Sequence, residues 1–358
     1  MAALALGAPP AVAGARTAAP SAWQLVPAPP ANGGELMDVA GSSPTDVWAV
    51  GERWTPSAAL LTFAMHWDGR AWSTVRTPSI SDWNMLRDVA VLSPDDAWAV
   101  GFTKNYANLI EHWNGSAWGI VPVPGLPADT PLYGVQAISA DDIWAVGQKG
   151  EDGLILHYDG TSWSSVPFPE PPGSDYTFFG KVAGVASNDV WAAGTAEVGT
   201  DQLLLLHWDG TSWTAAPGPK LGDFDYIRGG SALASNDIWF VGDTEGPAPD
   251  YTEHPLAIHW DGTAWASVRS EQGTEPWGVA QRSSADAWIA GSTGSASTTY
   301  EATVEHWSGG TWRTVAVPPT GQDSELNGIA SVSDGTVWAV GSYEPSGQTQ
   351  PLIMRLRP

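Results

Sequence analysis

The chain has 358 residues, of which 39 are acidic, 15 are basic and none is cysteine, so its formal net charge is −24. This charge makes nucleic acid and anionic membrane surfaces poor partners, and the absence of thiols excludes disulfides and thiolate-bound metal centres. Only 15% of the residues are charged, whereas glycine (40), proline (29) and tryptophan (22) are frequent. This profile predicts many short strands joined by turns rather than helices or disorder.

The first 20 residues combine a short apolar run with an Ala/Pro-rich stretch. They resemble a secretory signal peptide without its basic start, so we expect a secreted, extracellular protein. The alternative interpretation is a disordered leader of the same composition. No other stretch has the length and apolar character needed to span a bilayer, so we expect no membrane insertion.

A sequence repeat fills residues 21–358. A motif based on Asp-x-Trp-Ala-Val-Gly recurs with successive tryptophans 46 to 50 residues apart. Its seven tryptophans are Trp48, Trp98, Trp144, Trp191, Trp239, Trp288 and Trp338. Seven strand-like copies at this period predict one all-β domain, a seven-bladed β-propeller with four-stranded antiparallel blades.

Each period is expected to contain four strands. In chain order these are strand A with Leu-x-x-Val-Ala, strand B with Val-Trp-Ala-Val-Gly, strand C ending in His-Trp and, after an Asp-Gly turn, strand D beginning in Ser-Trp. The last period lacks a strand D, but residues 21–30 match that strand. We therefore expect the N-terminal strand to complete the last blade and close the ring, which removes the free sheet edges.

The period and the Asp-x-Trp-Ala-Val-Gly motif resemble those of secreted bacterial propellers of the kelch and galactose-oxidase-like class, with similarity to tectonin-type lectin repeats. The resemblance covers residues 21–358. It implies the propeller fold and, through the lectin repeats, a binding function.

The heptapeptide His-Trp-Asp-Gly-Thr-Ser-Trp (207–213) and its relatives contain residue types typical of a functional site. One copy per blade cannot converge on one metal ion, so we predict that the histidine hydrogen-bonds a neighbouring strand or turn. We predict that the aspartate of Asp-x-Trp accepts backbone N–H groups in the A–B turn and that the repeat tryptophans pack blade against blade. The repeat histidines are His66, His112, His157, His207, His259 and His306.

The D–A and B–C connections are long and irregular, whereas the A–B and C–D turns are short and uniform. The long connections share one face of a propeller, where we expect recognition to take place. One strand A position, two residues before the repeated valine, holds a different residue type in most blades, and only arginine occurs twice. Its residues are Met37, Arg87, Tyr133, Gly180, Arg228, Trp277 and Asn327. Because strand A is innermost, these residues should ring the mouth of the central channel. Two residues earlier lie Glu35, Met85, Pro131, Phe178, Tyr226, Glu275 and Glu325.

Two functions remain open. The first is the binding of a carbohydrate or another small polar organic ligand in this funnel, because aromatic rings stack on apolar faces while polar groups take hydroxyls. The residues predicted to bind this ligand are Trp83, Tyr133, Phe178, Tyr226, Trp277 and Asn327.

The second is an enzyme (a lyase, a hydrolase, or a cyclase or isomerase) that uses the same funnel. Its predicted acid–base and charge-stabilising residues are Arg87, Tyr133, Arg228, His254 and Glu325. No cofactor is expected: the acidic loops would admit calcium, but no Asp-x-Asp-x-Asp-Gly loop occurs. We expect a monomer with a glycan or another small molecule as its ligand.

Overall fold

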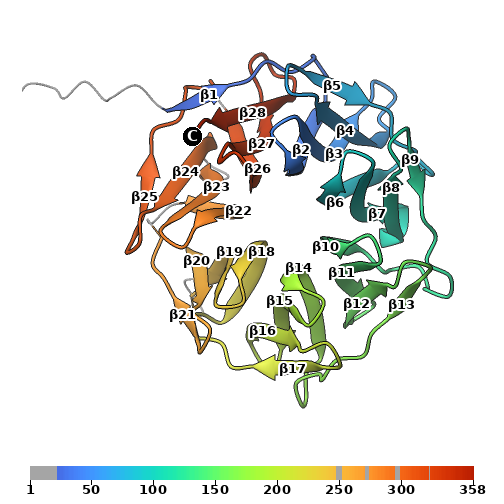
Figure 1. The fold of residues 1–358 in the computed structure, drawn as a ribbon, viewed down its shortest axis with the longest axis vertical. Coiled ribbons are helices and arrows are strands. Elements are labelled where there is room, and N and C mark those ends of the chain that lie inside the picture. The colour runs from blue at the N-terminus through green and yellow to red at the C-terminus, as the bar shows by residue number, and fades with distance from the viewer. Residues whose placement is uncertain (1–21, 247–251, 271–273, 295–298, 322) are drawn as a thin grey trace, which may run out of the picture.

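The computed structural model describes residues 22–358 apart from 247–251, 271–273, 295–298 and 322. The predicted leader, residues 1–20, lies outside the described residues. The described strands form seven four-stranded antiparallel sheets arranged as blades around a central axis (Figure 1). The predicted seven-bladed β-propeller is therefore confirmed. No helix of the described part is long and apolar enough to cross a membrane.

Every blade has the strand order A-B-C-D from the axis outward. The innermost strands A of blades 1 to 7 are β2 (Gly34–Ser43), β6 (Asn84–Ser93), β10 (Leu132–Ser139), β14 (Tyr176–Ala186), β18 (Phe224–Ala234), β22 (Thr274–Ser283) and β26 (Ser324–Ser331). The strands B are β3 (Asp46–Trp54), β7 (Asp96–Thr103), β11 (Asp142–Lys149), β15 (Asp189–Glu197), β19 (Asp237–Glu245), β23 (Asp286–Thr293) and β27 (Val337–Tyr343).

The outer half of each blade is shorter. The strands C are β4 (Leu60–Trp67), β8 (Asn108–Trp113), β12 (Asp152–Tyr158), β16 (Asp201–Trp208), β20 (Glu253–Trp260), β24 (Glu301–Trp307) and β28 (Gln350–Leu356). The strands D are β5 (Trp72–Val75), β9 (Trp118–Ile120), β13 (Trp163–Ser165), β17 (Trp213–Ala216), β21 (Trp265–Ser267), β25 (Trp312–Val315) and, for blade 7, β1 (Trp23–Leu25). A short 3-10 turn, η1 (Lys104–Tyr106), lies in the B–C connection of blade 2.

The ring closes as the sequence predicts. Strand β1, near the N-terminus, pairs antiparallel with β28, with Trp23 opposite Leu356 and Leu25 opposite Met354. Trp23 is only 1% exposed and packs edge-on against Trp288 of blade 6, with ring centroids 5.6 Å apart. The two ends of the domain are thus joined within one blade, and Trp23 of the outer strand is buried in the junction to the neighbouring blade.

The repeat tryptophans fill the blade junctions. Trp48 of blade 1 contacts Trp113 and Trp118 of blade 2 at ring-centroid distances of 4.8 and 5.1 Å. Blades 3 and 4 repeat this geometry, since Trp144 lies 5.1 and 5.3 Å from Trp208 and Trp213. The large rings close the wedge between twisted sheets, which confirms the predicted blade-to-blade packing.

The repeat histidines are part of the same scaffold. In blade 1 His66 Nε2 lies 2.7 Å from Asp46 Oδ1, and the His66 ring lies 4.4 Å from the Trp48 ring. The other five histidines make the same contact with the aspartate of their own blade at 2.8 to 3.0 Å. The predicted hydrogen bond to a neighbouring strand is confirmed.

The partner predicted for the aspartate of Asp-x-Trp was wrong. Its carboxylate hydrogen-bonds the repeat histidine and not the backbone N–H groups of the A–B turn. The strand register explains this. His66 lies opposite Trp48, and Asp46, two residues before Trp48, projects from the same face of the strand. Blade 7 has Thr336 and Arg355 at these two positions, and the Arg355 guanidinium lies 5.2 Å from the Trp338 ring centroid.

Candidate binding site in the central channel

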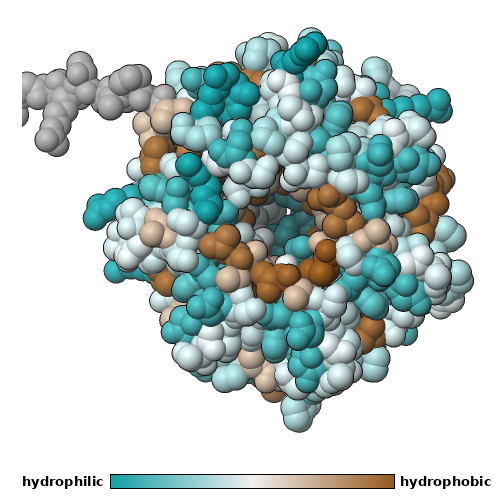
Figure 2. All heavy atoms as spheres, in the orientation of Figure 1, coloured by the Kyte–Doolittle hydropathy of each residue, from teal (hydrophilic) through white to brown (hydrophobic). Residues whose placement is uncertain are grey.

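A cavity of about 430 Å³ occupies the centre of the ring and is lined by the strands A of all seven blades. Figure 2 shows the hollow from one face, with hydrophobic residues gathered along its lower and right-hand sides and hydrophilic residues inside it. The volume lies within the range of small-molecule sites. The lining includes the whole predicted ring of strand A positions: Met37, Arg87, Tyr133, Gly180, Arg228, Trp277 and Asn327.

These seven residues share an unusual backbone position. In every blade the pairing of strands A and B shifts by one residue at this point, as between Leu36 and Asp38 or between Leu86 and Asp88. Each ring residue is therefore the extra residue of a β-bulge. A bulge re-aims side chains and interrupts the alternation of faces. Consequently, both the bulge residue and the residue after it reach the cavity, as Arg87 and Asp88 do.

The sequence analysis missed a charged cluster at the position after the bulge. This position holds glycine in four blades (Gly134, Gly229, Gly278 and Gly328) but Asp38, Asp88 and Lys181 in the other three. The glycines have little room for a side chain, since a Cβ at Gly328 would come within 2.5 Å of the Asp38 Cα. Charged residues at a crowded glycine position were the signal that could have revealed this cluster.

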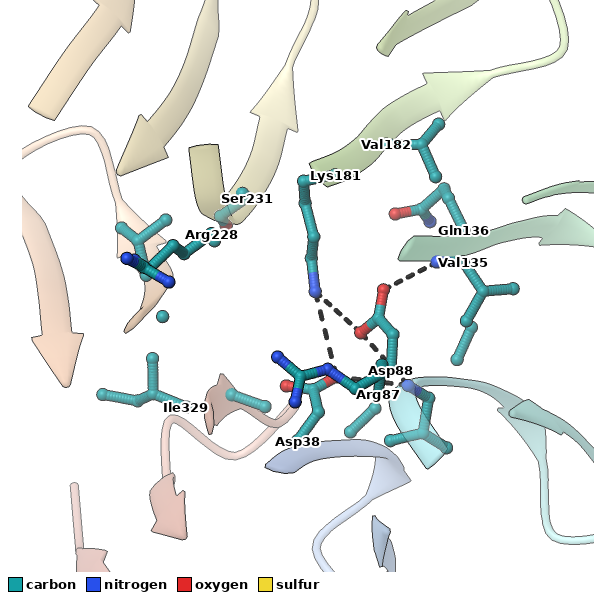
Figure 3. A pocket seen from close by; sticks show the side chains of 18 of the residues that line it. Asp38, Arg87, Asp88, Val135, Gln136, Lys181, Val182, Arg228, Ser231 and Ile329 are labelled. Atoms are coloured by element: carbon teal, nitrogen blue, oxygen red, sulfur yellow. Dashed lines mark hydrogen bonds and ion pairs between the residues drawn. The ribbon is translucent and has the colours of Figure 1, made fainter. Parts of the chain in front are cut away.

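Lys181 of blade 4 extends across blade 3 to reach the aspartates of blades 1 and 2 (Figure 3). Its Nζ lies 2.7 Å from Asp88 Oδ1 and 4.0 Å from Asp38 Oδ2. Asp88 also accepts backbone N–H groups of Val135 at 2.6 Å and of Val89 at 3.1 Å. The Asp88 side chain is only 2% exposed, and those of Asp38 and Lys181 are 15% exposed.

The protonation states of this cluster follow from burial and proximity. Burial raises the pKa of Asp38 well above its usual range, against a lowering by Lys181, and the hydrogen-bonded Asp88 adds to the rise. Burial opposes the charge on Lys181, but Asp88 and Asp38 together raise its pKa. The channel floor thus holds an ammonium group between two carboxyl groups, and burial opposes the negative charge on Asp38.

An aromatic wall lines one side of the cavity and consists of Tyr133, Phe178 and Tyr226. The Phe178 ring centroid lies 6.2 Å from that of Tyr133 and 6.1 Å from that of Tyr226. Burial raises the pKa of both tyrosines to about 12, so their hydroxyls stay protonated at neutral pH. The tyrosines are therefore suited to donate hydrogen bonds and not to act as bases.

An acidic rim continues around the mouth from blade 5 to blade 1. It consists of carboxyl groups that act on one another electrostatically but lie outside the cavity lining: Glu35, Glu52, Asp243, Glu245, Glu253, Glu275 and Glu325. Burial, together with the neighbouring carboxylates of Glu325 and Glu52, raises the pKa of Glu35 to about 8. The pKa of Glu275 is raised by burial and by Glu253, against a lowering by Arg228. The rim therefore gathers seven carboxyl groups around two arginines, and burial together with mutual repulsion opposes the charge on Glu35 and Glu275.

The two arginines of the cavity are both held by this rim. The Arg228 guanidinium pairs with Asp243 through its Nε and lies 4.2 Å from the Trp277 ring centroid. Arg87 is attracted by Glu52 and Glu35, although burial lowers its pKa. Trp277 Nε1 is buried and has no hydrogen-bond partner among the described residues. Asn327 Nδ2 donates to Glu35 Oε1 at 3.3 Å and to the Leu36 carbonyl at 3.0 Å.

The structure brings seven of the predicted site residues together and leaves three outside the cavity lining. The seven are Arg87, Tyr133, Phe178, Tyr226, Arg228, Trp277 and Asn327. Glu325 belongs to the acidic rim, where its Oε1 accepts the Ser342 hydroxyl at 3.2 Å. Trp83 packs on Phe102 directly before strand A of blade 2, and His254 is exposed on β20. In the described part of the chain, no group of three or more His, Cys, Asp or Glu side chains has the arrangement of a metal site.

Neither a family model nor a curated protein matches this chain. Several solved structures are similar. A structure of YCF48 bound to D1 peptide is 16% identical, with a TM-score of 0.59 over 94% of this chain and 97% of the other. YCF48 from Cyanidioschyzon merolae is 17% identical, with a TM-score of 0.57 over 94% and 99%. A chain of the mitotic checkpoint complex is 12% identical, with a TM-score of 0.60 over 100% and 99%. At these identities the similarity shows the β-propeller fold, and the resemblance to kelch and tectonin repeats stays a prediction.

Proposed function

We propose that this chain is an extracellular binding propeller that holds a carbohydrate with cationic amino groups in the central funnel. The observation that supports it most is the aromatic wall of the cavity together with the carboxyl groups of the rim, which act on the cavity residues Arg87 and Arg228. Aromatic rings stack on the apolar face of a sugar, carboxylates accept from hydroxyls and ammonium groups, and tyrosine hydroxyls donate.

The charge of the rim decides between neutral and cationic sugars. Burial is the largest cause of the raised pKa values of Glu35 and Glu275, and neighbouring carboxylates raise them further. A ligand ammonium group would relieve this repulsion, whereas a neutral hydroxyl would not. The floor formed by Asp38, Asp88 and Lys181 is also polar, so a ligand group that reaches it would be polar as well.

Catalysis in the same funnel stays a prediction. With their raised pKa values, Tyr133 and Tyr226 are poor candidates for the base that a lyase would require. Peptide binding, which one of the similar structures displays in its own chain, is an alternative that the experiment separates.

The experiment compares three tetrasaccharides by titration calorimetry: glucosamine tetramer, its N-acetylated form and the glucose tetramer cellotetraose. We expect the glucosamine tetramer to bind about tenfold or more tightly than the other two, because only it carries ammonium groups. The double variant Glu275→Gln and Glu325→Gln should remove most of this preference. Equal affinities would overturn the role of the rim. No saccharide binding, together with binding of a lysine-containing tetrapeptide, would overturn the carbohydrate assignment.

A further inference from the structure

An exposed aromatic surface lies beside the funnel on blades 1 and 2. We call it the outer platform, and it consists of Trp54, Ile80, Trp83 and Tyr106. Trp54, Ile80 and Tyr106 are 49%, 59% and 52% exposed, which is unusual for such large apolar side chains. Trp83 is half-buried, and the strand pairing places it near Trp54, because both lie beside the buried Leu60: Trp54 is its antiparallel partner and Trp83 forms a parallel bridge with it.

The outer platform is joined to the aromatic wall by an unbroken series of ring contacts. The Tyr106 ring lies 5.4 Å from the Phe102 ring, and Phe102 lies 5.9 Å from Tyr133, which lines the cavity. Tyr133 then leads to Phe178 at 6.2 Å and Phe178 to Tyr226 at 6.1 Å. Tyr106 and Tyr226 are thus four ring-to-ring steps apart, a path longer than one sugar unit can cover.

The backbone holds Tyr106 in a costly conformation. Asn105 and Tyr106 have φ angles of 62° and 57°, in the left-handed region that a bulky residue such as tyrosine rarely adopts. Such residues cost on the order of 1–3 kcal/mol each and tend to cluster at binding sites. Two backbone hydrogen bonds of 2.8 Å fix the turn, from Thr103 N to the Ala107 carbonyl and from Thr130 N to the Tyr106 carbonyl.

The backbone hydrogen bonds around the outer platform argue against a peptide on this surface. A peptide that adds to an edge needs free backbone donors and acceptors. Around the outer platform these groups are engaged: Leu60 N donates to the Asp82 carbonyl at 3.0 Å, and Lys104 N to the Trp83 carbonyl at 2.8 Å. The platform therefore offers ring faces, which suit the apolar faces of sugars.

From these observations we infer that the outer platform is a second subsite for the same ligand, and that the ligand is an oligosaccharide whose end lies in the funnel while later units stack on Trp54, Trp83 and Tyr106. This inference rests on the proposed function, and it adds that affinity depends on chain length.

The test measures the affinity of glucosamine dimer, tetramer and hexamer for the wild type and for the single variants Trp54→Ala and Tyr106→Ala. In the wild type we expect the hexamer to bind about tenfold or more tightly than the dimer, as stacking on one or two further rings would give. Each variant should reduce this ratio to about threefold or less and leave the dimer affinity unchanged. Leu233→Ala is the matched control, since Leu233 is a large residue of similar exposure (41%) near an A–B turn.

Each outcome is decisive. If glucosamine oligomers bind but the dimer and hexamer have equal affinity, or the ratio survives both variants, the outer subsite is refuted while the proposed function stands. If no glucosamine oligomer of any length binds, the proposed function fails and this inference fails with it. Tyr106→Phe, which keeps the ring, should retain the length dependence and so separates loss of stacking from distortion of the turn.

Discussion

The blade junctions and the central channel are built from the same repeat but obey different rules. At the junctions the same few residue types recur in nearly every blade, as with the tryptophan of strand B, which packs on two tryptophans of the next blade both between blades 1 and 2 and between blades 3 and 4. In the channel the position after the bulge is glycine in four blades and charged in three. Repetition marks what any blade needs in order to pack on its neighbour, and departure from it marks what the molecule needs only once.

The largest expected effect belongs to the junctions. Trp48→Ala should lower the free energy of unfolding by about 3–5 kcal/mol, because it leaves a cavity between blades 1 and 2. Trp277→Ala, in the channel, should cost much less and should instead weaken ligand binding. Urea denaturation of both variants checks this contrast. A Trp48→Ala protein as stable as the wild type would mean that the tryptophan side chains at the junctions do not stabilise the propeller.

Lys181→Met probes whether the channel cluster is also structural. The change removes the cation that two buried carboxyl groups share, which should cost about 3 kcal/mol, at the lower end for buried pairs because burial already raises the pKa of Asp38. Adding Asp38→Asn and Asp88→Asn should restore part of the loss, as urea denaturation would show. A single variant with wild-type stability would indicate that the ion pair contributes nothing to the fold.

Glu111 offers a test within the scaffold. This side chain is fully buried on β8, and burial raises its pKa to about 8, against a smaller lowering by Thr62. The folded state therefore binds the proton more tightly than the unfolded chain, so stability falls as the pH rises from about 4.5 towards 8. Glu111→Met places at this position the residue type of the equivalent Met65 in blade 1. Relative to the wild type, the free energy of unfolding of this variant should increase by about 3 kcal/mol as the pH rises from 5 to 8. A difference that does not depend on pH would contradict this account.

Ligand binding should change the protonation of Glu35 but not that of Glu111. Both have a pKa of about 8, but that of Glu35 is raised partly by Glu325 and Glu52. A bound cation favours the Glu35 carboxylate, so binding of an N-trimethylated glucosamine tetramer at pH 7.5 should release a proton and strengthen as the pH rises from 6 to 8. Calorimetry in buffers of different ionisation enthalpy measures the release. Glu35→Gln should abolish it and weaken binding about threefold, whereas Glu111→Gln should change neither.

The sequence was sufficient to predict the fold because the repeat encodes it directly. The period, the Asp-Gly turns and the incomplete last blade determined the blade number, the strand order and the closure by β1. Strict alternation along strand A placed Arg87 and Trp277 in the channel but left out Asp38, Asp88 and Lys181, because the bulge that brings them there interrupts the alternation. The ion pairs across blades 1, 2 and 4 join residues 93 and 143 positions apart, contacts that no local pattern contains.

Hydrogen–deuterium exchange with and without a saturating glucosamine hexamer tests the central claim most directly. The account predicts slower exchange in strands A around the channel and in the B–C connection that contains η1, with no change at the Asp-Gly turns of the opposite face. Protection confined to those turns and to the blade junctions would contradict it, because the ligand would then bind the repeated scaffold and not the channel.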